Sequence, residues 1–182
     1  MQLPPLDVLL TWPVGNYTNP SEVRGPAILA LTLTFVPFVL LLVAARIYTR
    51  VRLTKNLGAD DIVIVAAVVP TLACAVITVL AVLNYGWNRH IWDVPTNEIE
   101  TALKVAMAVE ILFSLGCTLT KISVLLLIIR VMASSSNFLR KLAIGMIILV
   151  SIEDLIFCIV SLNTCRLAFA LSSKHQLYLT LL

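Results

Sequence analysis

Two uncharged stretches constrain this chain more than any other feature of its sequence. Residues 25–45 and 62–85 contain no Asp, Glu, Lys or Arg, and each is long enough to cross a bilayer as a helix, which takes about 20 residues. Residues 105–129 and 142–164 are also apolar, with isolated charges. Because lipid offers no hydrogen bonds to an open backbone, each stretch must be a helix. The sequence therefore predicts an all-α, multipass transmembrane bundle with four membrane-spanning helices.

The composition agrees with a membrane protein and argues against several other classes. Hydrophobic residues make up 60% of the 182 residues and charged residues 13%, whereas a soluble domain has about 45–50% and about 25%. The net charge of +3 is too small to favour nucleic acid as a partner. The four cysteines have no metal-site spacing, and there is no GxSxG, HExxH, P-loop or GxGxxG motif. We therefore expect no enzyme activity, metal or cofactor, and the lipid bilayer as the main partner.

The basic residues predict how the helices are oriented. They concentrate in the first loop (Arg46, Arg50, Arg52, Lys55) and the third loop (Arg130, Arg140, Lys141), whereas the N-terminal tail and second loop offer Arg24, Arg89 and Lys104. Lys and Arg favour the cytoplasmic side, so we expect the tail, residues 1–24, to be extracellular. Asn16 begins an Asn-Tyr-Thr glycosylation acceptor in that tail, which agrees with this orientation. The predicted location is multi-pass, in the plasma membrane.

Two adjacent acids, Asp60 and Asp61, precede the second predicted helix. Carboxylates at this position accept hydrogen bonds from free backbone amides and suit the positive end of the helix dipole. A pair of aspartates could instead bind a metal ion, but no third ligand is close in the sequence. We favour the cap interpretation.

Four charged residues fall inside the third and fourth predicted helices: Glu110, Lys121, Glu153 and Asp154. Each costs about 2.5–3.5 kcal/mol at the centre of a transmembrane helix, so each needs a partner, water or neutralisation. Counted from the predicted helix ends, Lys121 and Glu153 lie at similar depths, which predicts a bridge between the two helices. Such a bridge, from Lys121 to Glu153 or Asp154, could be a functional polar switch or a packing contact, and the sequence favours neither.

The stretch YGWNRHIWDVP, residues 85–95, joins the second and third predicted helices. Its aromatic residues are typical of the belt at a membrane surface. Arg89, His90 and Trp92 could also form the mouth of an extracellular ligand site, because loops at helix ends often bind ligands. A lone His with no second metal ligand or nucleophile does not indicate catalysis. We favour an interfacial anchor.

Three motifs occur in an order that resembles a known family. RIYTRVRLTKNLGADD follows the first predicted helix, YGWNRHIWDVP follows the second, and LTKISVLLLIIRV ends the third. Together, over residues 26–166, they resemble the fungal rhodopsin-like integral membrane proteins, which have seven helices and include receptors for surface cues. The matching positions are Arg46, Tyr48, Arg50, Gly58, Asp60, Asp61, Gly86, His90, Glu110, Lys121, Ser123 and Arg130.

The sequence departs from that family in several places. Asn88 stands where a second glycine is usual, acids such as Glu153 and Asp154 are unusual, and residues 166–182 form a divergent tail after a rhodopsin-like domain at 25–165. Four of the expected seven helices are present, so we expect a truncated chain. Without a seventh helix there is no lysine for a retinal cofactor.

The resemblance implies a receptor or sensor that shifts between helix packings when something binds from outside. The alternatives are a small transporter or channel subunit that uses the intramembrane charges, and a non-functional fragment of a longer protein. Polar groups on the helices also predict association with other transmembrane helices or a second copy of the chain.

Overall fold

The computed structural model describes residues 11, 13, 26–90, 93–94, 96–132 and 137–180. For residues 96–100 and 165–180 it describes the backbone alone. The described elements are the α-helices α2 (Ala27–Tyr48), α3 (Ala59–Asn84), α4 (Thr96–Val131) and α5 (Asn137–Thr180), and a π-helical turn, η1 (Thr49–Thr54), that continues α2. Four of these segments are long and apolar enough to cross a membrane. The predicted all-α, four-span fold is confirmed.

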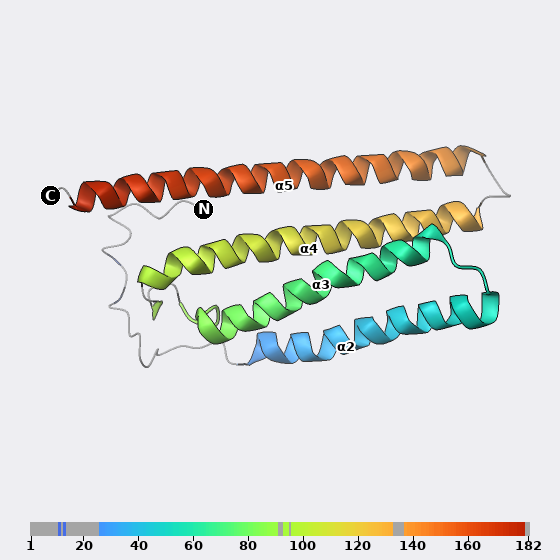
Figure 1. Cartoon of the computed structure of the whole chain (residues 1–182), viewed down its shortest axis with the longest axis horizontal. Coiled ribbons are helices and arrows are strands. Elements are labelled where there is room, and N and C mark those ends of the chain that lie inside the picture. Colours follow the sequence, from blue (N-terminus) through green and yellow to red (C-terminus); the bar gives the residue numbers. More distant parts are fainter. Residues whose placement is uncertain are drawn as a thin grey trace.

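The helices alternate in direction and lie side by side in chain order (Figure 1). Contacts between elements join α2 to α3, α3 to α4 and α4 to α5, with the most extensive contact between α3 and α4. The helices therefore form an open row in which α2 and α5 are the edges. The C-terminal ends of α2 and α4 and the start of α3 lie at one end of this row, and the end of α3, where the second loop begins, lies at the other (Figure 1).

Most of the large apolar side chains point outward. Within the candidate spans, at most 17% of the most apolar 18-residue window is buried inside the molecule. Exposed residues include Leu33 at 73% and Ile62 at 71%, as expected for helices whose surroundings are acyl chains. Little apolar surface is buried between the helices, so polar contacts and small residues have a larger part in holding them together.

One small residue sets the closest approach between α3 and α4. Gly116 of α4 is buried against Thr71 of α3, and a Cβ atom placed on it would lie 3.0 Å from the Thr71 hydroxyl oxygen. A larger side chain at Gly116 would push the two helices apart. The contact is thus of the small-residue kind that lets transmembrane helices pack closely.

The helices extend beyond the apolar stretches that predicted them. Hydropathy predicted 25–45, 62–85, 105–129 and 142–164, whereas α4 begins nine residues earlier at Thr96 and α5 begins at Asn137. Hydropathy marks the part of a helix that lies in lipid, but the backbone continues helically until a cap or turn ends it. Because α5 continues to Thr180, the predicted boundary at residue 165 does not coincide with a helix end.

Candidate functional site

Two buried carboxylates begin α3 at the end of the row that also holds the C-terminal ends of α2 and α4 (Figure 1). Asp60 and Asp61 each have a relative exposure of 2%. The Gly58 backbone N–H donates to Asp61 Oδ2 at 3.1 Å, so this side chain satisfies one of the amides that precede the first turn. The predicted cap is confirmed for Asp61. Burial, however, requires more than a cap, because an ionised carboxylate without cationic partners is costly away from water.

Three arginines from the neighbouring elements surround this pair. Arg46 of α2 donates from Nη2 to Asp60 Oδ2 at 3.0 Å and from Nε to Asp61 Oδ1 at 3.4 Å. Arg130 of α4 donates from Nη1 to Asp60 Oδ1 at 3.0 Å and lies 3.6 Å from Asp61 Oδ2. Arg50 of η1 approaches both carboxylates at 3.7 Å. We call Asp60, Asp61, Arg46, Arg50 and Arg130 the carboxylate–arginine cluster.

The local sequence explains why these groups meet. Arg46 and Arg50 are four residues apart, so they lie on one face of a continuous helix. The chain then turns at Lys55, whose left-handed backbone (φ 48°) ends η1, and α3 returns antiparallel with its acids first. Arg130 is in the last turn of α4, where the helix dipole favours a cation. Alternating helix directions bring all three helix ends to the same depth.

Backbone contacts fix the cluster further. The hydroxyl of Ser123, which is fully buried in α4, donates to the Asp60 carbonyl at 2.7 Å. Arg130 Nη2 donates to the Asn56 carbonyl at 2.6 Å. Gly58 leaves the room that the cluster needs, because a Cβ atom there would collide with Arg130 Nη1 and Asp60 Oδ1. The ends of α2, α3 and α4 are thus tied together by side chains.

The cluster is suited to holding helices together. Its carboxylate oxygens already accept from guanidinium and backbone N–H groups, and the described residues contain no group of three or more His, Cys, Asp or Glu that could hold a metal ion. Two carboxylates face three guanidinium groups, so the cluster keeps an excess of positive charge. A buried pair of this kind is strongly destabilised when one partner is removed.

The cluster lies within the region that identifies the chain. The family model of the fungal rhodopsin domain matches residues 45–169, which is more than half of the sequence and most of the predicted resemblance over 26–166. The chain belongs to the fungal rhodopsin domain family. No curated protein and no solved structure matches it. It is therefore a multi-pass membrane protein of the rhodopsin-like type, a family not known for enzymes.

The predicted ligand-mouth residues lie at the opposite end of this fungal rhodopsin domain protein. After α3 the chain turns at Gly86, whose positive φ of 63° favours glycine, and the Arg89 N–H donates to the Gly86 carbonyl. Both predicted residues lie in the second loop, where Arg89 is exposed and His90 is half-buried. Trp92, and Asn16 of the predicted glycosylation site, lie outside the described residues. The ligand-mouth interpretation stays a prediction.

The intramembrane charges are arranged differently from the prediction. Asp154 of α5 is half-buried and accepts a hydrogen bond from the Ser114 hydroxyl of α4 at 2.5 Å. Glu110, Lys121 and Glu153 are exposed. Among the described residues, no ion pair joins Lys121 to Glu153 or Asp154. The predicted bridge is therefore wrong.

Helix register explains the missing bridge. Because α5 begins at Asn137, Glu153 lies about 24 Å along it, whereas Lys121 lies about 15 Å from the end of α4 at Val131. Ser114 and Asp154, by contrast, each lie about 26 Å from those ends and meet. The prediction placed the start of the last helix five residues late, at 142. That shift made two residues of different depth look level.

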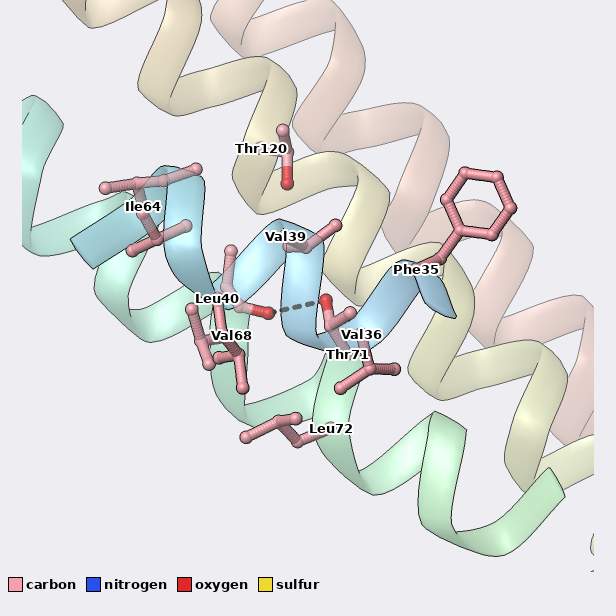
Figure 2. A pocket seen from close by; sticks show the side chains of 11 residues that line it. Phe35, Val36, Val39, Leu40, Ile64, Val68, Thr71, Leu72 and Thr120 are labelled. Atoms are coloured by element: carbon pink, nitrogen blue, oxygen red, sulfur yellow. Dashed lines mark hydrogen bonds between the residues drawn. The ribbon is translucent and has the colours of Figure 1, made fainter. Parts of the chain in front are cut away.

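An apolar pocket lies between α2 and α3. Figure 2 shows side chains from both helices around it, including Val39 and Leu40 of α2 and Val68 of α3, with Thr120 contributed by α4. Its volume is about 160 Å³, small beside the roughly 300–1,000 Å³ of ligand pockets. The Thr71 hydroxyl donates to the Ala67 carbonyl (Figure 2), so it is already engaged within its own helix.

The sequence indicates a role for every residue of the cluster but does not predict their contact with one another. Orientation signals account for Arg46, Arg50 and Arg130, and a helix cap accounts for Asp60 and Asp61. The signal that could have joined them is topological. Loops one and three were predicted on the same side, so buried acids and arginines at that side would meet. Ser123 is named only through the family resemblance, because a serine in a long apolar run has no distinctive pattern of its own.

Proposed function

We propose that this protein works as a receptor or sensor in the plasma membrane, with its N-terminus outside. In this proposal the carboxylate–arginine cluster is a cytoplasmic latch and the second loop is the outer sensing surface. The observation that carries the proposal is that the cluster ties the ends of α2, α3 and α4 at one end of the row, opposite the polar second loop.

The latch has the properties of a two-state element. Arg46 and Arg130 bind Asp60 from opposite sides, so α2 and α4 are joined at this end only through α3. Separating these groups exposes them to water, which offsets part of the lost attraction. A stimulus that favours separated helix ends can therefore shift the population without breaking the apolar contacts.

The first test uses orientation. Asn88→Cys in the second loop and Lys55→Cys in the first are labelled with a membrane-impermeant maleimide in intact cells, after the four native cysteines are replaced. We expect labelling of Asn88→Cys in intact cells, and of Lys55→Cys only after permeabilisation. The reverse pattern would place the cluster outside the cell and would sink the latch proposal.

A second test asks whether the two ends communicate. Biotin is attached to Asn88→Cys, an environment-sensitive fluorophore to an enzymatic peptide tag inserted between Met132 and Asn137, on the side of the cluster, and streptavidin is the outer stimulus. We expect streptavidin to change the fluorescence when the cluster is intact, and less in the Asp60→Asn, Asp61→Asn double variant. Equal responses in both proteins would show that the cluster is no latch.

A transporter or channel subunit is the second candidate. The exposed Glu110, Lys121 and Glu153 favour it, because charges inside a span often mark ion or proton pathways. Proteoliposomes with an internal pH-sensitive dye discriminate the two. Proton flux that Glu153→Gln abolishes would establish transport. The receptor proposal predicts no flux from the original protein or from Lys121→Met.

We also propose that the exposed charges contact other transmembrane helices or a second copy of the chain. A charged side chain facing acyl chains costs about 2.5–3.5 kcal/mol at mid-span, so cover by protein is favoured. Cross-linking in native membranes from Glu153→Cys tests this. Labelling of Glu153→Cys by lipid-soluble reagents without any cross-linked protein product would contradict the proposal.

A further inference from the structure

We propose that η1 and the turn after it bind the phosphate headgroup of an anionic lipid in the cytoplasmic leaflet, through Arg50, Arg52 and Lys55. The proposed site is the segment Thr49–Leu57, which we call the basic turn. Binding needs only the basic turn. The choice of the cytoplasmic leaflet, and the effect on the latch described below, rest on the proposed function.

The charge balance at this end of the row is the first observation. Beyond the cluster, which already has more guanidinium groups than carboxylates, Arg52, Lys55, Arg140 and Lys141 are exposed. The side chains of these four residues form no hydrogen bond or ion pair within the part of the chain that the structure describes. Clusters of Lys and Arg directly beside a membrane span attract anionic lipid headgroups.

The backbone of the basic turn places two cations on one side. In a π-helix the N–H group bonds five residues back, and the Lys55 N–H donates to the Arg50 carbonyl. Lys55 therefore follows Arg50 by one turn. Arg50 is still available to a ligand: its guanidinium lies 3.7 Å from each aspartate, which is an ion pair without a hydrogen bond. Its side chain is 23% exposed.

Apolar side chains in the same segment favour a lipid over a free anion. Val51, Leu53 and Leu57 alternate with the basic residues and are 45%, 72% and 59% exposed. Such residues avoid bulk water and insert at the boundary between headgroups and acyl chains, while long basic side chains extend to the phosphates. The exposed Tyr48 just before the turn also suits the interface. In this proposal the basic turn therefore lies at the depth of the lipid phosphate groups.

Binding a phosphate would draw Arg50 away from the aspartates. Arg46 and Arg130 hold Asp60 by hydrogen bonds at 3.0 Å, whereas Arg50 holds it only by the longer ion pair. Phosphate oxygens accept two parallel N–H bonds from one guanidinium, a better geometry than Arg50 has now. Anionic lipid is therefore expected to release η1 from the latch while leaving the Arg46 and Arg130 contacts in place.

The test measures lipid retention by native mass spectrometry on the purified chain, with phosphatidylinositol 4,5-bisphosphate as the probe and phosphatidylcholine as the reference lipid. The variant is Arg52→Gln, Lys55→Gln. Its matched control is Arg140→Gln, Lys141→Gln, which removes the same charge from the start of α5 at the same end. Since each basic residue near a membrane surface contributes modestly to anionic lipid binding, we expect roughly 5- to 30-fold weaker retention in the variant and less than about threefold in the control.

Each outcome decides something. Equal weakening in variant and control would mean diffuse surface attraction and would overturn the site. Undiminished binding in the variant would overturn it as well. Competition by millimolar inorganic phosphate, at matched ionic strength, would identify a free anion as the ligand and refute the lipid. All these readouts are independent of signalling, so the receptor proposal could fail while the lipid site stands, and the reverse.

Discussion

Arg130 Nη1 lies 3.0 Å from Asp60 Oδ1, and this contact joins the last turn of α4 to the first turn of α3. The same arginine reaches the Asn56 carbonyl, so one side chain holds both the acid and the loop that precedes it. Replacing a partner in a largely buried pair leaves the remaining charge uncompensated. The consequences are measurable as stability before any ligand is known.

Arg130→Gln should destabilise the protein by roughly 1–3 kcal/mol, less than for a fully buried pair because the Arg130 side chain is 26% exposed. Thermal unfolding in detergent, followed by cysteine reactivity, checks this. Arg140→Gln removes an exposed arginine at the same end and should change stability by no more than about 0.5 kcal/mol. Equal losses in the two variants would contradict the account.

Gly58→Ala should disturb the cluster sterically. The backbone there is extended, so strain is not the reason; the added methyl group would collide with Arg130 Nη1 and Asp60 Oδ1. We expect a loss of about 1–2 kcal/mol, by analogy with overpacking elsewhere. In an Arg130→Ala background the collision with the guanidinium disappears, so the cost of Gly58→Ala should fall. Additive effects in the double-mutant cycle would refute the contact.

Ser123→Ala should cost about 1 kcal/mol, because it removes a buried hydrogen bond between α4 and the Asp60 carbonyl. Ser151→Ala is the matched control: that hydroxyl is exposed and donates within its own helix to Ile147. Chemical denaturation in mixed micelles compares the two. A control as destabilised as Ser123→Ala would mean that the interhelical bond contributes nothing particular.

Gly116→Val should separate α3 from α4, since even a single Cβ would lie 3.0 Å from the Thr71 hydroxyl oxygen. The expected loss is roughly 1–3 kcal/mol. Gly145→Val in α5 provides the comparison, because a Cβ there meets nothing within 4 Å. If both variants unfold at the same temperature, close packing at Gly116 is not what holds the two helices.

The register of α4 and α5 can be tested by disulfide trapping. Ser114→Cys with Asp154→Cys should cross-link rapidly under mild oxidation in membranes, because these side chains are in contact. Lys121→Cys with Glu153→Cys should not, since they differ in depth by about 9 Å along the helices. Preferential trapping of the second pair would restore the bridge predicted from the sequence and reject the observed register.

The sequence was sufficient for the fold because lipid leaves few choices. Uncharged runs such as residues 62–85 can only be helices in a bilayer, and the family match confirms the motif-based resemblance. Helix ends were less accurate, since hydropathy stops at the lipid boundary while the backbone does not. That error changed the depth expected for Glu153 in α5 and led to the predicted Lys121–Glu153 bridge.

The candidate site was harder to predict because its chemistry depends on several helices at once. Arg46 and Asp60 are each ordinary at a membrane boundary, and only the antiparallel return of α3 brings them to 3.0 Å. The family resemblance names Ser123 but does not indicate its contact, because its role depends on facing a carbonyl of another helix. Spacing along one helix could be derived from periodicity; contacts between helices required the register.

The most direct test of the account is the distance between the ends of α2 and α4. Spin labels are placed at Val51→Cys and Val131→Cys, both exposed, in a background without the native cysteines, and the distance distribution is measured in lipid nanodiscs. With the cluster intact we predict one narrow distribution. In the Asp60→Asn, Asp61→Asn variant we predict a broader distribution with a longer mean. An unchanged distribution would show that the carboxylate–arginine cluster does not hold these helices together.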